Sequence, residues 1–217
     1  MCGRYSLYHD GVELRTRFFL STAYELHMQK RYNITPGSEV VVVTNTRTPE
    51  FMKWGLIPSW AMDLKIGFQM MNARSETIAE KPAFRSAFRK RRCFIPVSGW
   101  YEWRKNEDGS KTPFYFQRKD RELLALAGIW ETWTPPEGDE VRSAAIITTA
   151  ADPRFKDIHD RMPAVLLSID EWLREDLDLE RARSILAAPD VEDIESFAVS
   201  KLVNRPAVDS PECIRPA

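Results

Sequence analysis

A cysteine follows the initiator methionine directly in the opening sequence MCGRY, residues 1–5. Ordinary N-terminal processing removes the initiator methionine before a small residue, which would leave both an α-amine and a thiol on Cys2. The reference pKa values are about 8.5 for a thiol and about 7.7 to 8.0 for an α-amine, so both groups have a nucleophilic fraction near neutral pH. Because either group can attack a carbonyl, the sequence predicts covalent chemistry at Cys2.

Two further residues could move protons. Glu102 lies in the aromatic segment Cys93–Lys105, where the alternation of a β-strand places it on the same face as Trp100. Apolar surroundings raise a carboxyl pKa toward neutrality, as general acid–base catalysis requires; the alternative is an edge-strand glutamate that points into water.

His159 lies in the polar sequence IHDRMP, and imidazole titrates near neutral pH. The alternative for His159 is a structural histidine.

The sequence MNARSET, residues 71–77, supplies an amide and a guanidinium two residues apart. Asn72 could orient a substrate hydroxyl or amine, and Arg74 could bind a phosphate. A polar loop that satisfies its own backbone is the alternative.

The charge distribution favours an anionic partner for the first half of the chain. The net charge is -1, but residues 1–110 hold 17 Lys and Arg against 11 Asp and Glu, a net of +6, and the remaining residues have a net of -7. Arg85 to Arg92 contain five basic residues, which could form a phosphate-facing patch. A solvated helix end is the alternative interpretation of this run.

Composition indicates one soluble globular domain. The chain has 217 residues, 43% of them hydrophobic, with no apolar signal segment and no apolar run near the roughly 20 residues of a membrane helix. Three cysteines without CxxC spacing and three histidines suggest neither a disulfide framework nor a zinc site. We expect a cytoplasmic monomer without a cofactor, a metal or a membrane contact.

Hydrophobic periodicity predicts the α+β class. We expect a helix within residues 11–30, on the spacing of Leu14, Phe18, Tyr24 and His27, and a second helix from a capping box at Ser168 and Glu171 to about Leu186. Expected strands lie at 39–44, 51–55, 93–105, 112–118, 123–133, 141–149 and 197–203. Residues 1–217 should form a single domain built on a curved, mostly antiparallel sheet or barrel-like sandwich with flanking helices.

A series of motifs in this order resembles the SRAP family, the SOS-response-associated peptidases. The motifs are MCGRY, RYNITPG (31–37), WGLIPSW (54–60), MNARSET, RCFIPVSGWYEW (92–103), AGIWETW (127–133), ITTAA (147–151) and IHDRMP (158–163), followed by VSKLVNRP (199–206). The resemblance covers the whole chain and adds to the chemistry inferred for Cys2.

The resemblance implies a sensor of abasic sites in single-stranded DNA. Cys2 would condense with the ring-opened sugar aldehyde, as an imine through its amine and then as a thiazolidine through its thiol. Asn72 would position the amine and sugar, Glu102 would shuttle protons during imine formation and strand cleavage, and His159 would assist sugar ring opening and crosslink reversal.

The same resemblance implies a DNA-binding surface. Arg4, Arg74 and Arg161 would contact phosphates, whereas Pro36 and Trp54 would offer apolar surface to unstacked bases.

Two other classes of function stay open at this point. Cys2 could be the nucleophile of an N-terminal-nucleophile thiol peptidase whose own α-amine acts as the base. The protein could also be a noncatalytic single-strand-binding module in which Cys2 is incidental. Abasic DNA distinguishes the three, because they predict covalent capture, peptide turnover and reversible binding without preference, respectively.

Overall fold

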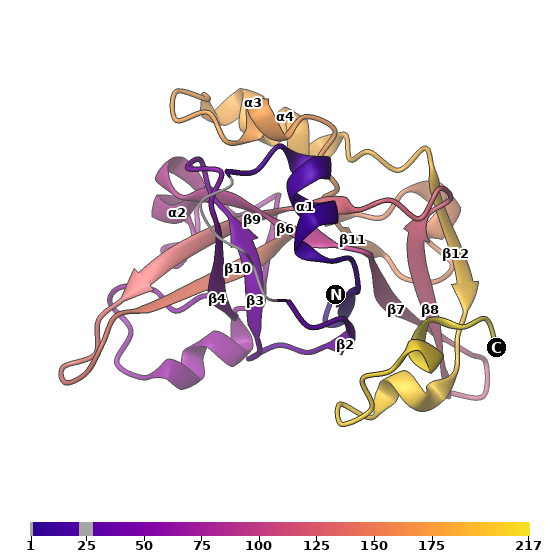
Figure 1. The fold of residues 1–217 in the computed structure, drawn as a ribbon. Coiled ribbons are helices and arrows are strands. Elements are labelled where there is room, and N and C mark those ends of the chain that lie inside the picture. Colours follow the sequence, from indigo (N-terminus) through magenta and orange to yellow (C-terminus); the bar gives the residue numbers. More distant parts are fainter. Residues whose placement is uncertain (1, 22–27) are drawn as a thin grey trace.

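The computed structural model describes residues 2–21 and 28–217, which form two β-sheets with a few short helices at their margins (Figure 1). The five-stranded sheet has the order β12-β8-β7-β1-β2, with bounds β1 (Tyr5–Leu7), β2 (Arg31–Ile34), β7 (Gly99–Lys105), β8 (Lys111–Arg118) and β12 (Ile194–Ala198). Every strand pair in it is antiparallel. The predicted α+β class with a curved, mostly antiparallel sheet is confirmed.

The second sheet closes on itself. Its seven strands are β3 (Glu39–Val43), β4 (Pro49–Trp54), β5 (Asn72–Arg74), β6 (Arg92–Val97), β9 (Leu124–Trp133), β10 (Val141–Ala150) and β11 (Arg161–Pro163). Six of them follow the order β11-β10-β4-β3-β6-β9, β5 pairs with β10 outside this order, and β9 pairs again with β10. The pairings of β10 with β4 and with β5 are parallel. The long strand β10 therefore connects short segments from distant parts of the chain.

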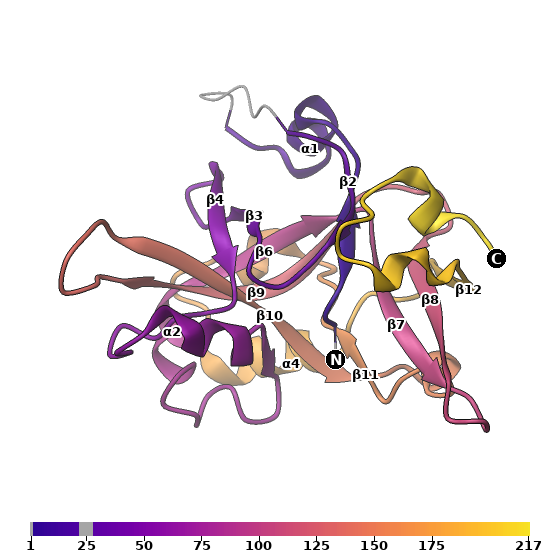
Figure 2. The same ribbon diagram turned by 90° about the horizontal axis from the view of Figure 1, so that it is seen from below.

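The helices are short and lie outside the sheets (Figures 1 and 2). They are α1 (Gly11–Phe18), α2 (Arg85–Lys90), α3 (Ile169–Trp172) and α4 (Leu179–Ala187), with 3₁₀ turns η1 (Leu64–Gln69), η2 (Pro153–Phe155), η3 (Lys201–Asn204) and η4 (Pro211–Ile214). Within the described residues, no helix is long and apolar enough to cross a membrane.

The expected strand 93–105 is two strands in different sheets, β6 and β7. The chain turns between them at Ser98, whose hydroxyl accepts a hydrogen bond from the Tyr8 backbone N–H at 2.9 Å. A Cβ at Gly99 would lie only 2.3 Å from the Phe116 carbonyl oxygen. The glycine thus allows the chain to pass from one sheet to the other at close range, which strand alternation alone does not predict.

The expected helix from Ser168 to about Leu186 is interrupted. The Ser168 hydroxyl caps α3 by accepting the Glu171 N–H, but α3 ends at Trp172 and a separate cap at Asp178 starts α4. Arg92 donates hydrogen bonds to the carbonyls of Trp172 and Arg174, so these carbonyls are satisfied without a continuing helix.

The predicted basic patch at residues 85–92 is wrong for its last two members. Arg92 is only 6% exposed because its guanidinium also binds the carbonyls of Phe88 and Arg89 at the end of α2. Arg91 pairs with Glu131. The other three basic side chains of the run are exposed on α2.

Two other predicted boundaries change. The helix expected within 11–30 ends at Phe18, because Phe19 adopts a left-handed conformation with φ 50°, and Tyr24 and His27 lie outside the described residues. The strand expected at 197–203 is β12, which ends at Ala198, and residues 201–204 form η3 instead.

Candidate functional site

The structure brings Cys2 and Asn72 into contact across seventy positions of sequence. Cys2 precedes β1 and is fully buried, and the Asn72 side-chain amide donates a hydrogen bond to the Cys2 carbonyl at 2.8 Å. Asn72 is fixed because β5 pairs with β10, with Asn72 opposite Ile146. Its Oδ1 is buried and has no hydrogen-bond partner among the described residues. Asn72 therefore holds the first residues of the chain and keeps an acceptor available for an amine or hydroxyl.

The Cys2 thiol lies in an environment that disfavours its ionised form. Burial raises its pKa well above the ordinary value, and the negative charge of Glu102 raises it further, while a backbone hydrogen bond from Arg4 acts in the opposite direction. The thiol is consequently neutral near pH 7, and its reaction with an electrophile needs a nearby group that can accept the proton.

Glu102 is such a group. It lies on β7 opposite Phe114 of β8 and is only 2% exposed, so the alternative of an edge-strand glutamate in water is wrong. Burial raises its pKa from 4.5 to about 7, and the charge of Asp160 acts in the same direction. A carboxyl group that titrates near pH 7 can both accept and donate a proton under physiological conditions.

His159 lies beside Glu102, with 3.9 Å between its Nε2 and Glu102 Oε2. Its Nδ1 accepts a hydrogen bond from the Arg161 backbone N–H at 2.9 Å, and burial lowers the pKa of the imidazole. The contact with the Arg161 N–H fits a tautomer with its proton on Nε2, on the side of Glu102, whereas the Arg161 carbonyl, 3.2 Å from Nδ1, fits a tautomer with its proton on Nδ1. Asp160 Oδ1 lies 3.1 Å from Nδ1 of His159. It can accept a hydrogen bond from that nitrogen when the imidazole is protonated on both nitrogens.

The three predicted phosphate-binding arginines differ in how they are held. Arg74 is exposed on β5. The Arg161 guanidinium forms a paired contact with the Glu76 carboxylate and also donates to the Thr148 carbonyl at 2.6 Å. Because β5 and β11 both pair with the end of β10, Arg74 and Arg161 project from neighbouring parts of the same sheet.

Arg4 is tied into the protein rather than extended into solvent. Its Nη1 donates to Asn33 Oδ1 and to the Val203 carbonyl, both at 2.6 Å, and its guanidinium lies 6.0 Å from the Trp103 ring centroid. Burial lowers the pKa of this arginine. These contacts fix the segment that follows Cys2.

The structure does not place Trp54 where a base could stack on it. The side chain is 2% exposed, its indole N–H donates to the Met71 carbonyl at 3.0 Å, and its ring packs on Tyr5 at a centroid distance of 5.1 Å. Trp54 thus supports the segment that carries Asn72. Pro36, the other predicted apolar contact, is partly exposed.

Sequence reasoning missed two exposed aromatic residues. Trp60 is 58% exposed and Phe68 is 56% exposed, and Phe68 lies against Gly37, next to Pro36. The available signal was the presence of large apolar residues in the stretch between β4 and β5, where η1 is the regular element that the structure describes. Among the described residues, no group of three or more His, Cys, Asp or Glu side chains is arranged to hold a metal.

This fold and this arrangement around Cys2 define the class of protein. The family described as "SOS response associated peptidase (SRAP)" matches residues 1–206, and the chain belongs to this family, which confirms the resemblance found in the sequence.

Relatives give a more particular comparison. The chain is 38% identical over 221 residues to the abasic site processing protein YoqW of Bacillus subtilis, with 99% of each chain covered. It is 31% identical to the abasic site processing protein HMCES of Rattus norvegicus over 76% of this chain and 56% of that protein. A crystal structure of a protein from Bacteroides thetaiotaomicron superposes with a TM-score of 0.88 at 27% identity, covering 100% of both chains. A protein from Bordetella bronchiseptica superposes with a TM-score of 0.79 at 25% identity, covering 92% of this chain and 100% of the other.

Proposed function

We propose that this protein processes abasic sites in single-stranded DNA by forming a covalent crosslink through Cys2 after Met1 is removed. The names of its relatives support abasic-site processing. The observation that carries the chemistry is the convergence of the Asn72 amide, the Glu102 carboxyl and the His159 imidazole on one buried site next to Cys2.

The first step requires the aldehyde form of the abasic sugar. In the proposed mechanism, His159 Nε2 gives a proton to the ring oxygen as the sugar opens and takes up the proton that the anomeric hydroxyl releases, so the imidazole ends the step neutral. Asn72 Oδ1 accepts a hydrogen bond from the Cys2 amine and orients the nitrogen lone pair toward the aldehyde carbon.

The second step joins the protein to the DNA. The amine nitrogen bonds to the aldehyde carbon, and the resulting carbinolamine loses water to give an imine, with Glu102 taking the proton from nitrogen and returning one to the leaving hydroxyl. The Cys2 sulfur then adds to the imine carbon while the thiol proton passes to the nitrogen. The net result is a thiazolidine and one water molecule. A pKa of about 7 suits Glu102 to both proton transfers.

Reversal and strand cleavage follow from the same intermediates. Protonation of the thiazolidine sulfur reopens the imine, and loss of a proton from the neighbouring sugar carbon of that imine would expel the 3′ phosphate. We propose that the protein works as a cytoplasmic monomer on single strands, with Arg74 and Arg161 near the phosphates, while Arg4 fixes the segment that follows Cys2.

The decisive test is covalent capture of an oligonucleotide with one abasic site, followed on a denaturing gel. The purified protein should lack Met1 by intact mass and should form an adduct that survives denaturation. Cys2→Ala and Cys2→Ser both keep the α-amine, so each should reach only the imine, which borohydride traps, and neither should form a stable adduct without the reductant. A full adduct yield from Cys2→Ala would refute the proposal, whereas peptide turnover without DNA capture would favour the thiol peptidase.

A further inference from the structure

Glu76 connects the two segments that carry Asn72 and His159. Its carboxylate accepts hydrogen bonds from both terminal nitrogens of the Arg161 guanidinium, with Nη2 at 3.0 Å. Glu76 follows β5, which begins at Asn72, and Arg161 is the first residue of β11, two positions after His159. The chemistry proposed for Cys2 makes no use of this ion pair between Glu76 and Arg161.

The ion pair crosses the end of β10. Thr148 of β10 pairs with β5 and also with β11, so these two strands lie on opposite edges of β10 at this residue. The Thr148 carbonyl accepts the Ser75 backbone N–H at 2.9 Å, from the β5 edge, and it also accepts Arg161 Nη2 at 2.6 Å. The Arg161 side chain therefore reaches across β10 from its own edge to the opposite one, where Glu76 holds it.

The two strands that the ion pair joins are short. β5 and β11 have three residues each, and among the described residues each of them pairs only with β10. The Arg161 backbone N–H donates to His159 Nδ1 at 2.9 Å, and the other ring nitrogen of His159 lies beside Glu102. A contact that fixes Arg161 therefore also fixes the imidazole ring next to Glu102.

The exposure of the ion pair separates a positioning role from a role in global stability. The Glu76 side chain is 50% exposed, whereas the Arg161 side chain is 11% exposed. The hydrogen bond from Arg161 holds the pKa of Glu76 below its ordinary value, so the carboxylate is charged near pH 7. Ion pairs with a solvated partner contribute little to the free energy of unfolding. Replacing Glu76 should consequently loosen the local geometry without unfolding the chain.

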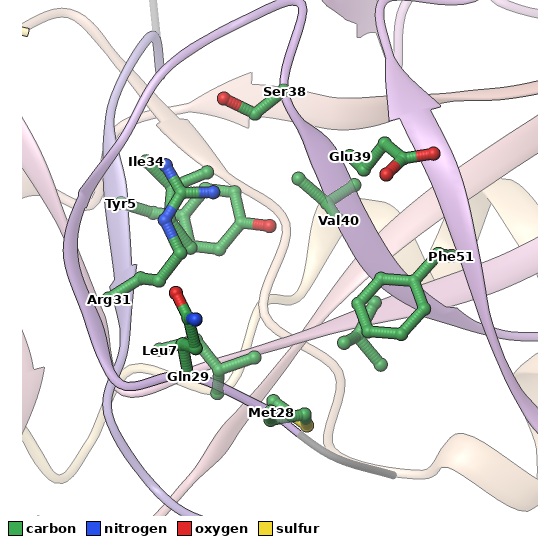
Figure 3. Close-up of a pocket in the computed structure, with 11 residues that line it drawn as sticks. Tyr5, Leu7, Met28, Gln29, Arg31, Ile34, Ser38, Glu39, Val40 and Phe51 are labelled. Atoms are coloured by element: carbon green, nitrogen blue, oxygen red, sulfur yellow. The ribbon is translucent and has the colours of Figure 1, made fainter.

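The ion pair is not part of the pocket drawn in Figure 3. That pocket has a volume of about 480 Å³, and its lining side chains come from β1, from β2 and the segment before it, and from β3 and β4. Neither Glu76 nor Arg161 lines it. A substitution at Glu76 therefore leaves the lining of this pocket unchanged and acts at the end of β10.

We propose that Glu76 is a positioning residue for the proton transfers of His159 and that it acts through Arg161. This inference rests on the proposed function, in which His159 assists sugar ring opening and crosslink reversal. With Glu76 in place, the Arg161 guanidinium joins the two edges of β10 and the His159 ring stays beside Glu102. Without Glu76, Arg161 keeps its contact with Thr148 but loses the contact with the β5 segment. The His159 ring then spends less time where it can give or take a proton.

The test follows the transfer of crosslinked protein to excess competitor abasic DNA, a first-order reversal that DNA affinity does not limit. We expect Glu76→Gln to slow this transfer by at least about fivefold, because a misplaced catalytic group can cost about 100-fold in rate. Its melting temperature should fall by no more than about 4 °C. Glu80→Gln, which changes an exposed glutamate of the same stretch, is the matched control and should transfer at the wild-type rate.

A double-variant comparison tests whether Glu76 acts through Arg161. Arg161→Gln should slow the transfer, and the variant with both substitutions should be no slower than Arg161→Gln alone, because both changes remove one contact. Effects that multiply would overturn the proposal. Transfer by Glu76→Gln at or above the wild-type rate would also overturn it, since Glu76 would then only shield the charge of Arg161.

Hydrogen exchange in the protein without DNA separates this inference from the proposed function. The Arg161 amide, which donates to His159, should exchange about threefold to fivefold faster in Glu76→Gln than in wild type, and Glu80→Gln should leave it unchanged. If wild type forms no adduct, the proposed function itself fails. If wild type forms the adduct but the Arg161 amide of Glu76→Gln exchanges at the wild-type rate, the positioning role of Glu76 alone is overturned.

Discussion

The raised pKa of Glu102 gives a quantitative prediction for the variant Glu102→Gln. The carboxyl pKa is about 7 in the folded protein against an ordinary 4.5, and a shift of this size corresponds to about 3 kcal/mol. Because the folded state binds the proton more tightly, the stabilisation is fully present below pH 4.5. It is lost as the pH rises through about 7. Above that pH the protein carries a buried carboxylate that destabilises the folded state.

Glutamine keeps the shape of the side chain and cannot ionise. The free energy of unfolding of Glu102→Gln, relative to wild type, should therefore rise by about 3 kcal/mol between pH 4 and pH 8. Urea unfolding at one-unit pH intervals measures this difference, and Glu107→Gln, which changes an exposed side chain, is the matched control. The same variant should form the abasic-site adduct more slowly at every pH, since glutamine transfers no proton.

The shape of the stability difference tests the reasoning. If the unfolding free energies of wild type and Glu102→Gln run parallel from pH 4 to pH 8, Glu102 does not titrate in this range and the proposed proton transfers need another group. A difference that appears only for Glu102→Gln and not for Glu107→Gln supports the assignment to the buried carboxyl.

The remaining predictions concern DNA binding, reversal and folding. Arg74→Ala should reduce the magnitude of the salt dependence of single-strand binding by about 0.7 in log K against log salt, and an unchanged slope would place the DNA contacts elsewhere. His159→Ala should slow the transfer of crosslinked protein to competitor abasic DNA between pH 5 and pH 8, and exchange at the wild-type rate at every pH would leave His159 a structural role. Gly99→Ala should lower the free energy of unfolding, measured by urea titration, by about 1 to 3 kcal/mol, because the added Cβ would lie 2.3 Å from the Phe116 carbonyl oxygen. Wild-type stability of this variant would mean that the passage of the chain from β6 to β7 adjusts to the methyl group at little cost.

Local sequence signals were sufficient for most elements. Strand alternation placed Glu102 on the same face as Trp100, because the side-chain period of a strand needs only its immediate neighbours, but it left open whether that face was buried, and the structure buries both side chains. Ser168 was correctly identified as a helix cap for the same reason. The helix it begins nevertheless ends early, since Arg92, far away in sequence, binds the carbonyls of Trp172 and Arg174.

The sequence by itself determined the strand-rich α+β class, the membership suggested by the ordered motifs and the residue types available for chemistry near Cys2. Only the tertiary structure decided which of those residues meet and in what state. The Asn72 contact to Cys2 spans seventy positions and depends on the parallel pairing of β5 with β10. The pKa of Glu102 depends on burial by strands that pair across the fold. Desolvation and nonlocal pairing are properties of the assembled chain, so no local pattern could supply them.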